Sequence, residues 1–462
     1  MPLTGSACDV GAGAFAPAGM EPGCTRSAAR AGLKSPGSRV LRRTAARIIV
    51  WTPFFLAGVG LSGSVGANGF SLPVQDSLQI GRASAGIVAA ASDASTAFHN
   101  PAGMTELVGE EMLAGATVVY AGYDVANRNS TATTPGTGGA PVPLTGDNGH
   151  PRTLEVVPTL FYARPMTPER NFWIGLALTS PWGLGVKYDD DWFGRYDSIE
   201  TRLTTVNLSP VVAYRVTEWL SIGGGPSAAT DGRTKVTGDD ISVGFNVGVL
   251  VKPWSRTRIG LHYRSGMSHD LKGNLRVSRL TGALAPGNGR FNAKVRLREP
   301  DVASIGIAHE VISGTTLFTE AQWFNWSRFN ELRVERSDGG PDSVRPQEWK
   351  DTWSFYGGIE QRLFESWTLR GGAGFEQTPT VDRFRNTSLP DGDRVRIGVG
   401  VSYDWSDRLR IDFGYAHVFS QKESINLTET FFEGTGAAGS VNTRARASLS
   451  INDFALRVRY RF

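Results

Sequence analysis

Several segments of the chain alternate strictly between apolar and polar positions, and the clearest is the last one, INDFALRVRYRF. One face of this segment is polar or small, and the other is apolar and holds Phe454, Leu456, Val458, Tyr460 and Phe462. The same alternation runs through residues 394–405 (RVRIGVGVSYDW) and 408–419 (RLRIDFGYAHVF). A period of two residues is typical of a β-strand with two unlike faces.

The length and aromatic content of these segments indicate the kind of sheet. Each runs for about 12 residues, whereas strands of soluble proteins usually have about five or six. A strand that crosses a bilayer needs about 9–11 residues. The apolar faces end in aromatic residues, as strands do at membrane interfaces. A soluble β-sandwich would also alternate, but these features favour a transmembrane β-barrel of the outer-membrane type.

Counting such segments predicts an all-β fold, a 14-stranded antiparallel transmembrane β-barrel. The even number agrees with a closed bacterial barrel, and so does the alternation of long and short connections. Strands are expected near residues 112–124, 154–164, 171–180, 201–216, 219–236, 241–252, 256–278, 291–311, 315–336, 350–361, 367–377, 394–405, 408–421 and 451–462. The long connections are 125–153, 181–200, 337–349, 378–393 and 422–450.

The longest apolar run, Ile48 to Leu61, has 14 residues. It is too short to span a bilayer as a helix, which takes about 20 residues. Arginines precede it and small residues follow it, which is the pattern of a secretory signal peptide. We expect a signal peptide over residues 39–67 and a mature start at Asn68; a buried helix of a cytosolic domain is the alternative. Residues 1–38 are expected to be a mis-called leader.

The charge and the cysteines of the chain are concentrated in this N-terminal part. The chain has 48 basic and 44 acidic residues, and residues 1–67 hold seven of the former and two of the latter. The remainder is close to neutral, so the composition gives no support for nucleic-acid binding. Both cysteines, Cys8 and Cys24, precede residue 68, so disulfides and thiolate chemistry are not expected in the mature chain.

Catalytic and metal-binding motifs are not evident in the mature sequence. It has no G-x-S-x-G serine elbow, and its six histidines are scattered without the spacing of a metal site. We therefore expect no catalytic residues, no metal and no cofactor, and a protein that is not an enzyme.

Residues 68–109 lie between the expected signal peptide and the expected barrel, residues 110–462. This segment is rich in small residues and contains the stretch DASTAFHNPAGM, broken at Asn100-Pro101. Proline lacks an amide donor and restricts the residue before it, so a helix must end there. Wall side chains alone do not fill a wide barrel. The segment is predicted to be a hatch that plugs the lumen, with a periplasmic tail as the alternative.

The segment from Asn68 to Leu107 resembles the hatch of the FadL/TodX family of outer-membrane transporters of hydrophobic compounds, including its Asn-Pro-Ala element at Asn100, Pro101 and Ala102. Further stretches similar to that family are TSPWGLGVKYDDDWFGRY (179–196), WFNWSRFNEL (323–332), WKDTWSFYGGIE (349–360) and LPDGDRVRIGVGVSYDW (389–405). The resemblance covers residues 68–462.

The resemblance implies passive uptake of long-chain fatty acids or of aromatic and aliphatic hydrocarbons. In that family the ligand meets an apolar groove on the outer loops, then an internal pocket, and leaves sideways where the third strand kinks inward. Here the third strand is residues 171–180, and its only internal glycine, Gly175, is the expected bend. Ordinary barrel curvature is the alternative reason for this glycine.

One departure from the family concerns the outer groove. The long connection between the fifth and sixth strands is reduced here to about TGDD, Thr237 to Asp240, so part of the groove is missing and the cargo class stays open. An apolar capture surface is expected instead from side chains of the 181–200 connection, with a headgroup girdle as the alternative. These side chains are Trp182, Leu184, Trp192 and Phe193.

Two other functions are compatible with a barrel. An outer-membrane hydrolase would need a serine and a histidine at one height of the wall, and a general porin would need an unplugged lumen. The expected partners are hydrophobic small molecules, outer-membrane lipid and, through the C-terminal Phe462, the barrel-assembly machinery. The expected location is the outer membrane of a Gram-negative cell, with the protein as a monomer.

Overall fold

The structure is a computed structural model that describes residues 68–462 except 233–236, 278–287, 341, 435 and 437. The expected leader (1–38) and signal peptide (39–67) lie outside the described residues. No helix within the described part of the chain is long and apolar enough to cross a membrane.

Within the described residues, fourteen strands form one closed antiparallel ring, because β1 pairs with β4 on one side and with β22 on the other. The predicted 14-stranded barrel is therefore confirmed. In order around the ring the strands are β1 (Glu111–Asn127), β4 (Arg152–Pro165), β5 (Phe172–Thr179), β7 (Glu200–Arg215), β8 (Leu220–Gly232), β9 (Thr237–Trp254), β10 (Thr257–Arg264), β13 (Val302–Ile312), β14 (Thr315–Phe324), β17 (Thr352–Leu363), β18 (Trp367–Glu376), β19 (Arg394–Asp404), β20 (Leu409–Ser420) and β22 (Gly439–Arg461).

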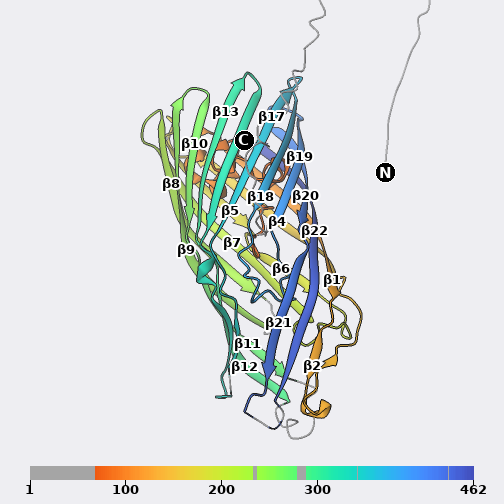
Figure 1. Cartoon of the computed structure of the whole chain (residues 1–462). Coiled ribbons are helices and arrows are strands. Elements are labelled where there is room, and N and C mark those ends of the chain that lie inside the picture. Colours follow the sequence, from red (N-terminus) through yellow and green to blue (C-terminus); the bar gives the residue numbers. More distant parts are fainter. Residues whose placement is uncertain (1–67, 233–236, 278–287, 341, 435, 437) are drawn as a thin grey trace, which may run out of the picture. The chain divides into compact units, whose positions relative to one another are not determined.

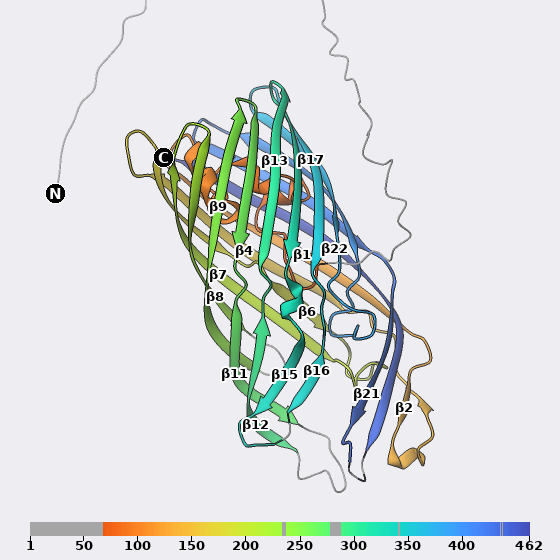
Figure 2. The ribbon, with the colours of Figure 1, turned by 60° about the vertical axis from the view of Figure 1, so that its left-hand side comes forward.

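Shorter strands extend the barrel at one end. Most belong to connections that were predicted to be loops, and they are β2 (Thr131–Thr133), β3 (Val142–Pro143), β6 (Gly183–Lys187), β11 (Ser268–Val277), β12 (Gly289–Arg298), β15 (Glu331–Arg336), β16 (Ser343–Pro346) and β21 (Glu423–Phe431). Figure 1 shows β2, β11, β12 and β21 at the end opposite the C-terminus, and Figure 2 shows the same arrangement from another side.

Several predicted boundaries were wrong. The expected strand 315–336 is divided into β14, which ends at Phe324, and β15, which begins at Glu331. The expected strands 256–278 and 291–311 are each divided in two, at Gly266 and at Pro300, which face each other across the two breaks. Proline cannot donate to a ladder, so pairing stops there. The expected loop 422–450 contains the β21–β22 hairpin. Residues Thr237–Asp240, expected to be a loop remnant, lie in β9.

The two faces of the wall follow the alternation of the sequence. On β7 the inward side chains are small and polar and buried, as at Asn207 and Ser209, whereas Val206, Leu208 and Val212 point outward and are exposed. On β22 the exposed set is Phe454, Leu456, Val458 and Tyr460, and the buried set between them includes Asp453 and Arg457. An apolar exterior around a polar interior is the arrangement of a barrel in a membrane.

The hatch occupies the lumen near the end where the C-terminus lies (Figure 1, orange). It contains the short helices α1 (Ser77–Gly81), α2 (Ile87–Ala90) and α3 (Thr96–His99) and the 3-10 helix η1 (Pro101–Glu106). Among residues 68–107 only Ser92 is exposed. Glycines of the wall permit this packing, since a Cβ on Gly398 or Gly260 would lie 2.1 Å or 2.0 Å from the carbonyl oxygen of Ile80 or Val88. The small residues of the hatch therefore pack against wall positions that also lack a side chain.

Candidate functional site

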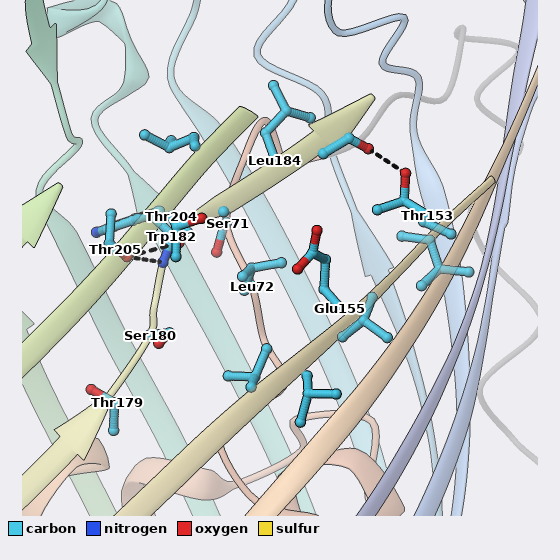
Figure 3. A pocket seen from close by; sticks show the side chains of 18 of the residues that line it. Ser71, Leu72, Thr153, Glu155, Thr179, Ser180, Trp182, Leu184, Thr204 and Thr205 are labelled. Carbon is cyan, nitrogen blue, oxygen red and sulfur yellow. Dashed lines mark hydrogen bonds between the residues drawn. The ribbon is translucent and has the colours of Figure 1, made fainter. Parts of the chain in front are cut away.

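An apolar cavity of about 220 Å³ lies between the hatch and the wall strands β1, β4, β5, β6 and β7. Figure 3 shows Leu72 of the hatch between Glu155 on β4 and the strand that carries Leu184. Most of the lining is apolar, and besides these residues it includes Val119, Val157, Leu178, Trp182, Leu203 and Leu389. Binding sites for small apolar molecules have this character, a concave apolar surface with few polar groups.

The wall beside this cavity is interrupted. The ladder between β4 and β5 ends at the pair Leu160–Leu178, and after Thr179 the chain leaves the sheet at Ser180–Trp182. It resumes as β6, which pairs with β7 and has no backbone ladder with β4. Side chains bridge the gap instead: Thr153 Oγ1 donates to the Gly185 carbonyl oxygen at 3.0 Å, and Arg202 Nη2 on β7 donates to Glu155 Oε2 on β4 at 3.0 Å. The cavity thus adjoins a place where strands β4 and β6 are not joined by backbone hydrogen bonds.

The expected bend at Gly175 is not at this interruption. Gly175 pairs in register with Ala163 on β4 and Val211 on β7, so the sheet is continuous there. A Cβ at this position would lie 2.5 Å from Met104 Sδ and 3.2 Å from Ala97 Cβ. The glycine therefore leaves room for the hatch, and the break falls at Pro181, which has no amide hydrogen to donate.

The two charged side chains that line the cavity are both paired. Glu155 is 3.0 Å from Arg202 Nη2. Arg394 Nη2 donates to Asp391 Oδ1 at 2.8 Å and to the Gly69 carbonyl oxygen at 3.3 Å. The Gly69 amide in turn donates to Asp391 Oδ2 at 3.1 Å. The Arg394–Asp391 pair therefore holds the first described residues of the hatch at the edge of the cavity.

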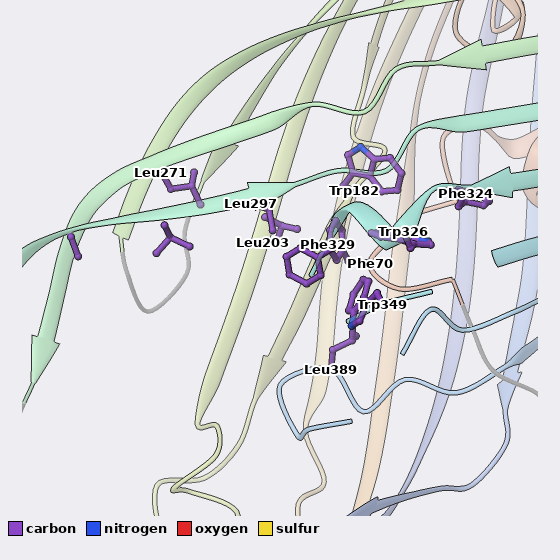
Figure 4. Packing of buried hydrophobic residues seen from close by; sticks show 12 residues of the cluster. Phe70, Trp182, Leu203, Leu271, Leu297, Phe324, Trp326, Phe329, Trp349 and Leu389 are labelled. Carbon is purple, nitrogen blue, oxygen red and sulfur yellow. The ribbon is translucent and has the colours of Figure 1, made fainter. Parts of the chain in front are cut away.

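An aromatic cluster encloses Phe70 next to the Arg394–Asp391 pair (Figure 4). The Phe70 ring lies 4.7 Å from Trp326, 5.7 Å from Trp349 and 5.9 Å from both Trp182 and Phe329, between ring centroids. Asn68 Oδ1 accepts a hydrogen bond from Trp326 Nε1 at 2.9 Å. Since Trp182 also lines the cavity, the cluster joins the start of the hatch to the cavity wall.

The Asn-Pro-Ala element holds the hatch to the opposite wall. Asn100 is fully buried, and its Nδ2 donates to the carbonyl oxygens of Val88 at 2.8 Å and Val249 at 3.0 Å. Its Oδ1 accepts from the Ala102 amide at 3.2 Å, which starts η1 with Pro101 at the first position. One side chain thus bonds to α2, starts η1 and bonds to β9.

Ion pairs also fix the hatch inside the barrel. Arg457 on β22 bonds to Asp76 Oδ1 at 3.2 Å and to Asp93 Oδ2 at 2.5 Å, and both carboxylates belong to the hatch. Burial by itself would raise the pKa of Asp76, but Arg457 and His99 outweigh it and hold this pKa below its ordinary range. The carboxylate of Asp76 therefore stays charged at physiological pH, and so does its bond to the wall.

The four side chains expected to form one capture surface lie in two different places in the structure. Trp182 and Leu184 line the cavity. Trp192 and Phe193 do not, because they are buried in a separate cluster where Trp192 stacks on Tyr188 at 3.7 Å. Trp182, Trp192 and Phe193 are at most 3% exposed, so they form neither an open outer surface nor a headgroup girdle.

The sequence interpretation missed several residues of the site. Leu72 and Phe70 come from the hatch, and Thr153 and Glu155 come from β4. The sequence does indicate the aromatic cluster beside the cavity, through the two aromatic stretches at 323–332 and 349–360. These stretches supply Trp326, Phe329 and Trp349. The described residues contain no group of three or more His, Cys, Asp or Glu side chains that could hold a metal ion.

The fold and the site define an outer-membrane barrel whose lumen holds a hatch and whose wall is interrupted beside an apolar cavity. The chain belongs to the outer membrane protein transport family (OMPP1/FadL/TodX), because the model of that family matches residues 58–233 and 227–462. The predicted membership and outer-membrane location are thereby confirmed.

Curated relatives and solved structures agree with this membership. The chain is 26% identical over 412 residues to a long-chain fatty acid transport protein of Salmonella typhi, covering 80% of this chain and 92% of the relative. It is 26% identical over 423 residues to the protein of the same name from Escherichia coli K12, with the same coverage. It resembles the fold of a FadL homologue from Pseudomonas aeruginosa (TM-score 0.75, 24% identity, 86% of this chain and 100% of that chain). The Ralstonia pickettii toluene transporter TbuX has a similar fold (TM-score 0.58, 18% identity, 85% and 100%).

Proposed function

We propose that this protein takes up hydrophobic molecules passively across the outer membrane, and that its cargo is long-chain fatty acids or aromatic or aliphatic hydrocarbons. The observation that carries the proposal is the position of the apolar cavity, which lies between the hatch and the interruption of the wall. A molecule in this cavity reaches the bilayer between β4 and β6 without crossing the hatch. Burial of apolar surface, worth about 25 cal/mol per Å², favours such cargo over sugars.

The comparisons support this class of cargo. The curated relatives are named as long-chain fatty acid transport proteins, and one structural neighbour is named as a toluene transporter. The protein acts as a transporter and not as an enzyme, and it needs no cofactor. It works as a monomer among outer-membrane lipids. Its C-terminal Phe462, which is exposed, is the residue that the barrel-assembly machinery recognises.

The hatch also weighs against a general porin. It fills the lumen with buried residues that are bonded to the wall at Asn100, Asp76 and Asp93. A lumen filled in this way conducts small polar solutes poorly.

Uptake by whole cells that lack other transporters of this class tests the proposal. Cells expressing the protein should accumulate a labelled long-chain fatty acid or alkylbenzene several-fold faster than control cells, with no change for a disaccharide. Leu184→Glu should abolish the gain, because it places an unpaired charge in the apolar cavity.

Leu427→Glu is the matched control. Leu427 is a half-buried leucine of β21 that does not line the cavity, so this variant should transport normally. Equal uptake by control cells and by cells with the protein would refute the proposed function.

A further inference from the structure

The outward face of β22 changes in character along the strand. Near the C-terminus its outward positions are apolar and exposed, and they are Phe454, Leu456, Val458 and Tyr460. The next three outward positions hold neutral polar residues, Asn452, Ser450 and Ser448. Two exposed arginines, Arg446 and Arg444, follow at the next two outward positions. One face of the strand thus passes from apolar through neutral polar to basic positions.

This order matches the layers of the outer leaflet of the membrane. β21 lies at the end of the barrel opposite the C-terminus (Figure 1). Barrels of this class have short turns on the periplasmic side and long connections on the extracellular side. The apolar positions of β22 therefore lie in the hydrocarbon layer, and Arg444 and Arg446 lie on its extracellular side. In Gram-negative cells the lipid of that leaflet is a phosphorylated glycolipid, with acyl chains, sugars and phosphates.

The neutral polar positions of β22 form a hydrogen-bonded group with β20. Tyr415 Oη donates to Asn452 Oδ1 at 2.9 Å, and His417 Nδ1 lies 2.9 Å from the same oxygen. All three side chains face outward, because the residues between them, such as Ala416 and Asp453, are buried. Tyrosine is common where the hydrocarbon layer meets the headgroups. Within the described residues the amide nitrogen of Asn452 has no acceptor, so it can donate to a sugar hydroxyl.

Arg444 and Arg446 have uncharged neighbours across the ladder. Arg446 faces Ser424 on β21 and Ala126 on β1. Arg444 faces Asn426 on β21. Within the described part of the chain, neither guanidinium has an ion-pair partner. The two residues lie about 7 Å apart along the strand, at about 3.4 Å per residue, so both side chains can reach one phosphate group.

The nearby carboxylates do not neutralise these two arginines. Asp124 on β1 faces outward, but it is paired with Arg152 at 3.0 Å. Glu423 and Glu429 alternate with the exposed residues of β21, so they face inward. Glu433 lies in the hairpin tip beyond both strands. An anionic group that approaches this face therefore meets two free cations.

We propose that the outward face of β20, β21 and β22 binds the phosphorylated glycolipid of the outer leaflet. Its acyl chains lie along the apolar positions of β22, its sugar lies at Asn452 and His417, and one phosphate lies between Arg444 and Arg446. Arginine suits this role, because its planar group can donate two hydrogen bonds to phosphate oxygens. The inference does not depend on the transported cargo, since none of these four residues lines the apolar cavity.

Native mass spectrometry of the detergent-purified protein tests the proposal by measuring which lipids stay bound. The probes are lipid A with both phosphates, lipid A without phosphates, and phosphatidylglycerol, each at the same concentration. The unaltered protein should retain lipid A with both phosphates most tightly. The double variant Arg444→Gln, Arg446→Gln should weaken its binding roughly tenfold to thirtyfold, from about fivefold for each arginine at a charged lipid surface. Binding of lipid A without phosphates should not change.

Asn452→Leu tests the sugar contact separately. It should weaken both forms of lipid A severalfold, because it removes a donor to the sugar and leaves the arginines in place. The matched control for the arginines is the double variant Arg256→Gln, Arg408→Gln. These two exposed arginines lie in the β9–β10 and β19–β20 turns at the periplasmic end, so this variant should bind all three lipids as the unaltered protein does. Heat-modifiable migration in gels shows that each variant is folded.

Three results would overturn the proposal. Equal retention of the two forms of lipid A by the unaltered protein would show that no phosphate is bound, and this result needs no variant. Retention of phosphatidylglycerol as tight as that of lipid A with both phosphates would show a general attraction for anionic lipid. Equal weakening by the two double variants would show that net charge, and not this face of the barrel, holds the lipid.

Discussion

At the scale of single residues, the hatch depends on a few polar side chains that bond in several directions. Asn100 is the clearest example, since its amide group bonds to α2, η1 and β9 from a fully buried position. A buried carbonyl that loses its donor costs about 1–3 kcal/mol. Two carbonyls, those of Val88 and Val249, depend on Asn100.

Asn100→Ala should therefore loosen the hatch by about 2–6 kcal/mol, from two carbonyls at 1–3 kcal/mol each, while the barrel stays folded. Hydrogen exchange should increase in residues 77–106 and not in the wall, and uptake of hydrophobic cargo should fall. Asn442→Ala removes a half-buried asparagine of β22 that is bonded to Thr428 on β21 and serves as the control. Unchanged exchange in the hatch of Asn100→Ala would contradict the role given to this residue.

Residue positions were predictable from the sequence where the backbone alone determines the outcome. Asn100-Pro101 ends α3 as expected, because proline removes a donor whatever surrounds it. The surroundings of a tryptophan depend on tertiary packing instead. Trp182 and Trp192 stand ten positions apart in one connection, yet one lines the cavity and the other stacks on Tyr188. Local sequence does not distinguish these two places.

At the scale of elements, alternation determined the strands well because a membrane requires both faces to be specified. It did not determine where the third strand leaves the sheet. Gly175 is the residue type expected at a bend, but it lies against Met104 of the hatch, where a side chain would not fit. The break at Pro181 arises because β6 pairs with β7 and not with β4. The sequence of a single strand does not show which strands it will pair with. The same reason explains why β21, which pairs with β22, was expected to be a loop.

Closing the interruption of the wall should stop transport. A Cβ on Gly185 would lie 3.0 Å from Thr153 Cγ2, which is within reach of a disulfide between cysteines at these positions. The double variant Thr153→Cys, Gly185→Cys should take up cargo when reduced and lose most of its uptake when oxidised. Each single variant controls for the substitution, because it cannot form the bond. Full uptake by the oxidised double variant would show that cargo does not leave between β4 and β6.

At the scale of the whole molecule, the barrel and the hatch are two parts with different tasks. The ring of backbone hydrogen bonds closes without the hatch, since β1 pairs with β22 and β4 directly. The hatch adds side-chain bonds to the wall at Asn100, Asp76 and Asp93, and its Gly69 amide donates a hydrogen bond to Asp391. The membrane-spanning ring therefore closes independently of the hatch, and we propose that selectivity depends on the hatch.

Deleting residues 68–109 should separate these two tasks. The remaining ring keeps all fourteen strands, and Arg457 keeps Asp412 as a partner at 2.9 Å, so the barrel should still migrate as a folded, heat-modifiable protein. The emptied lumen should conduct ions, because a barrel wider than about eight strands is not filled by its own side chains. The apolar cavity loses its hatch side, with Ser71 and Leu72, so selective uptake of hydrophobic cargo should disappear. Planar-bilayer recordings should show a higher single-channel conductance for the deletion than for the intact protein. A folded deletion variant that conducts no better would mean that the hatch does not block the lumen, and the transport route proposed here would be wrong.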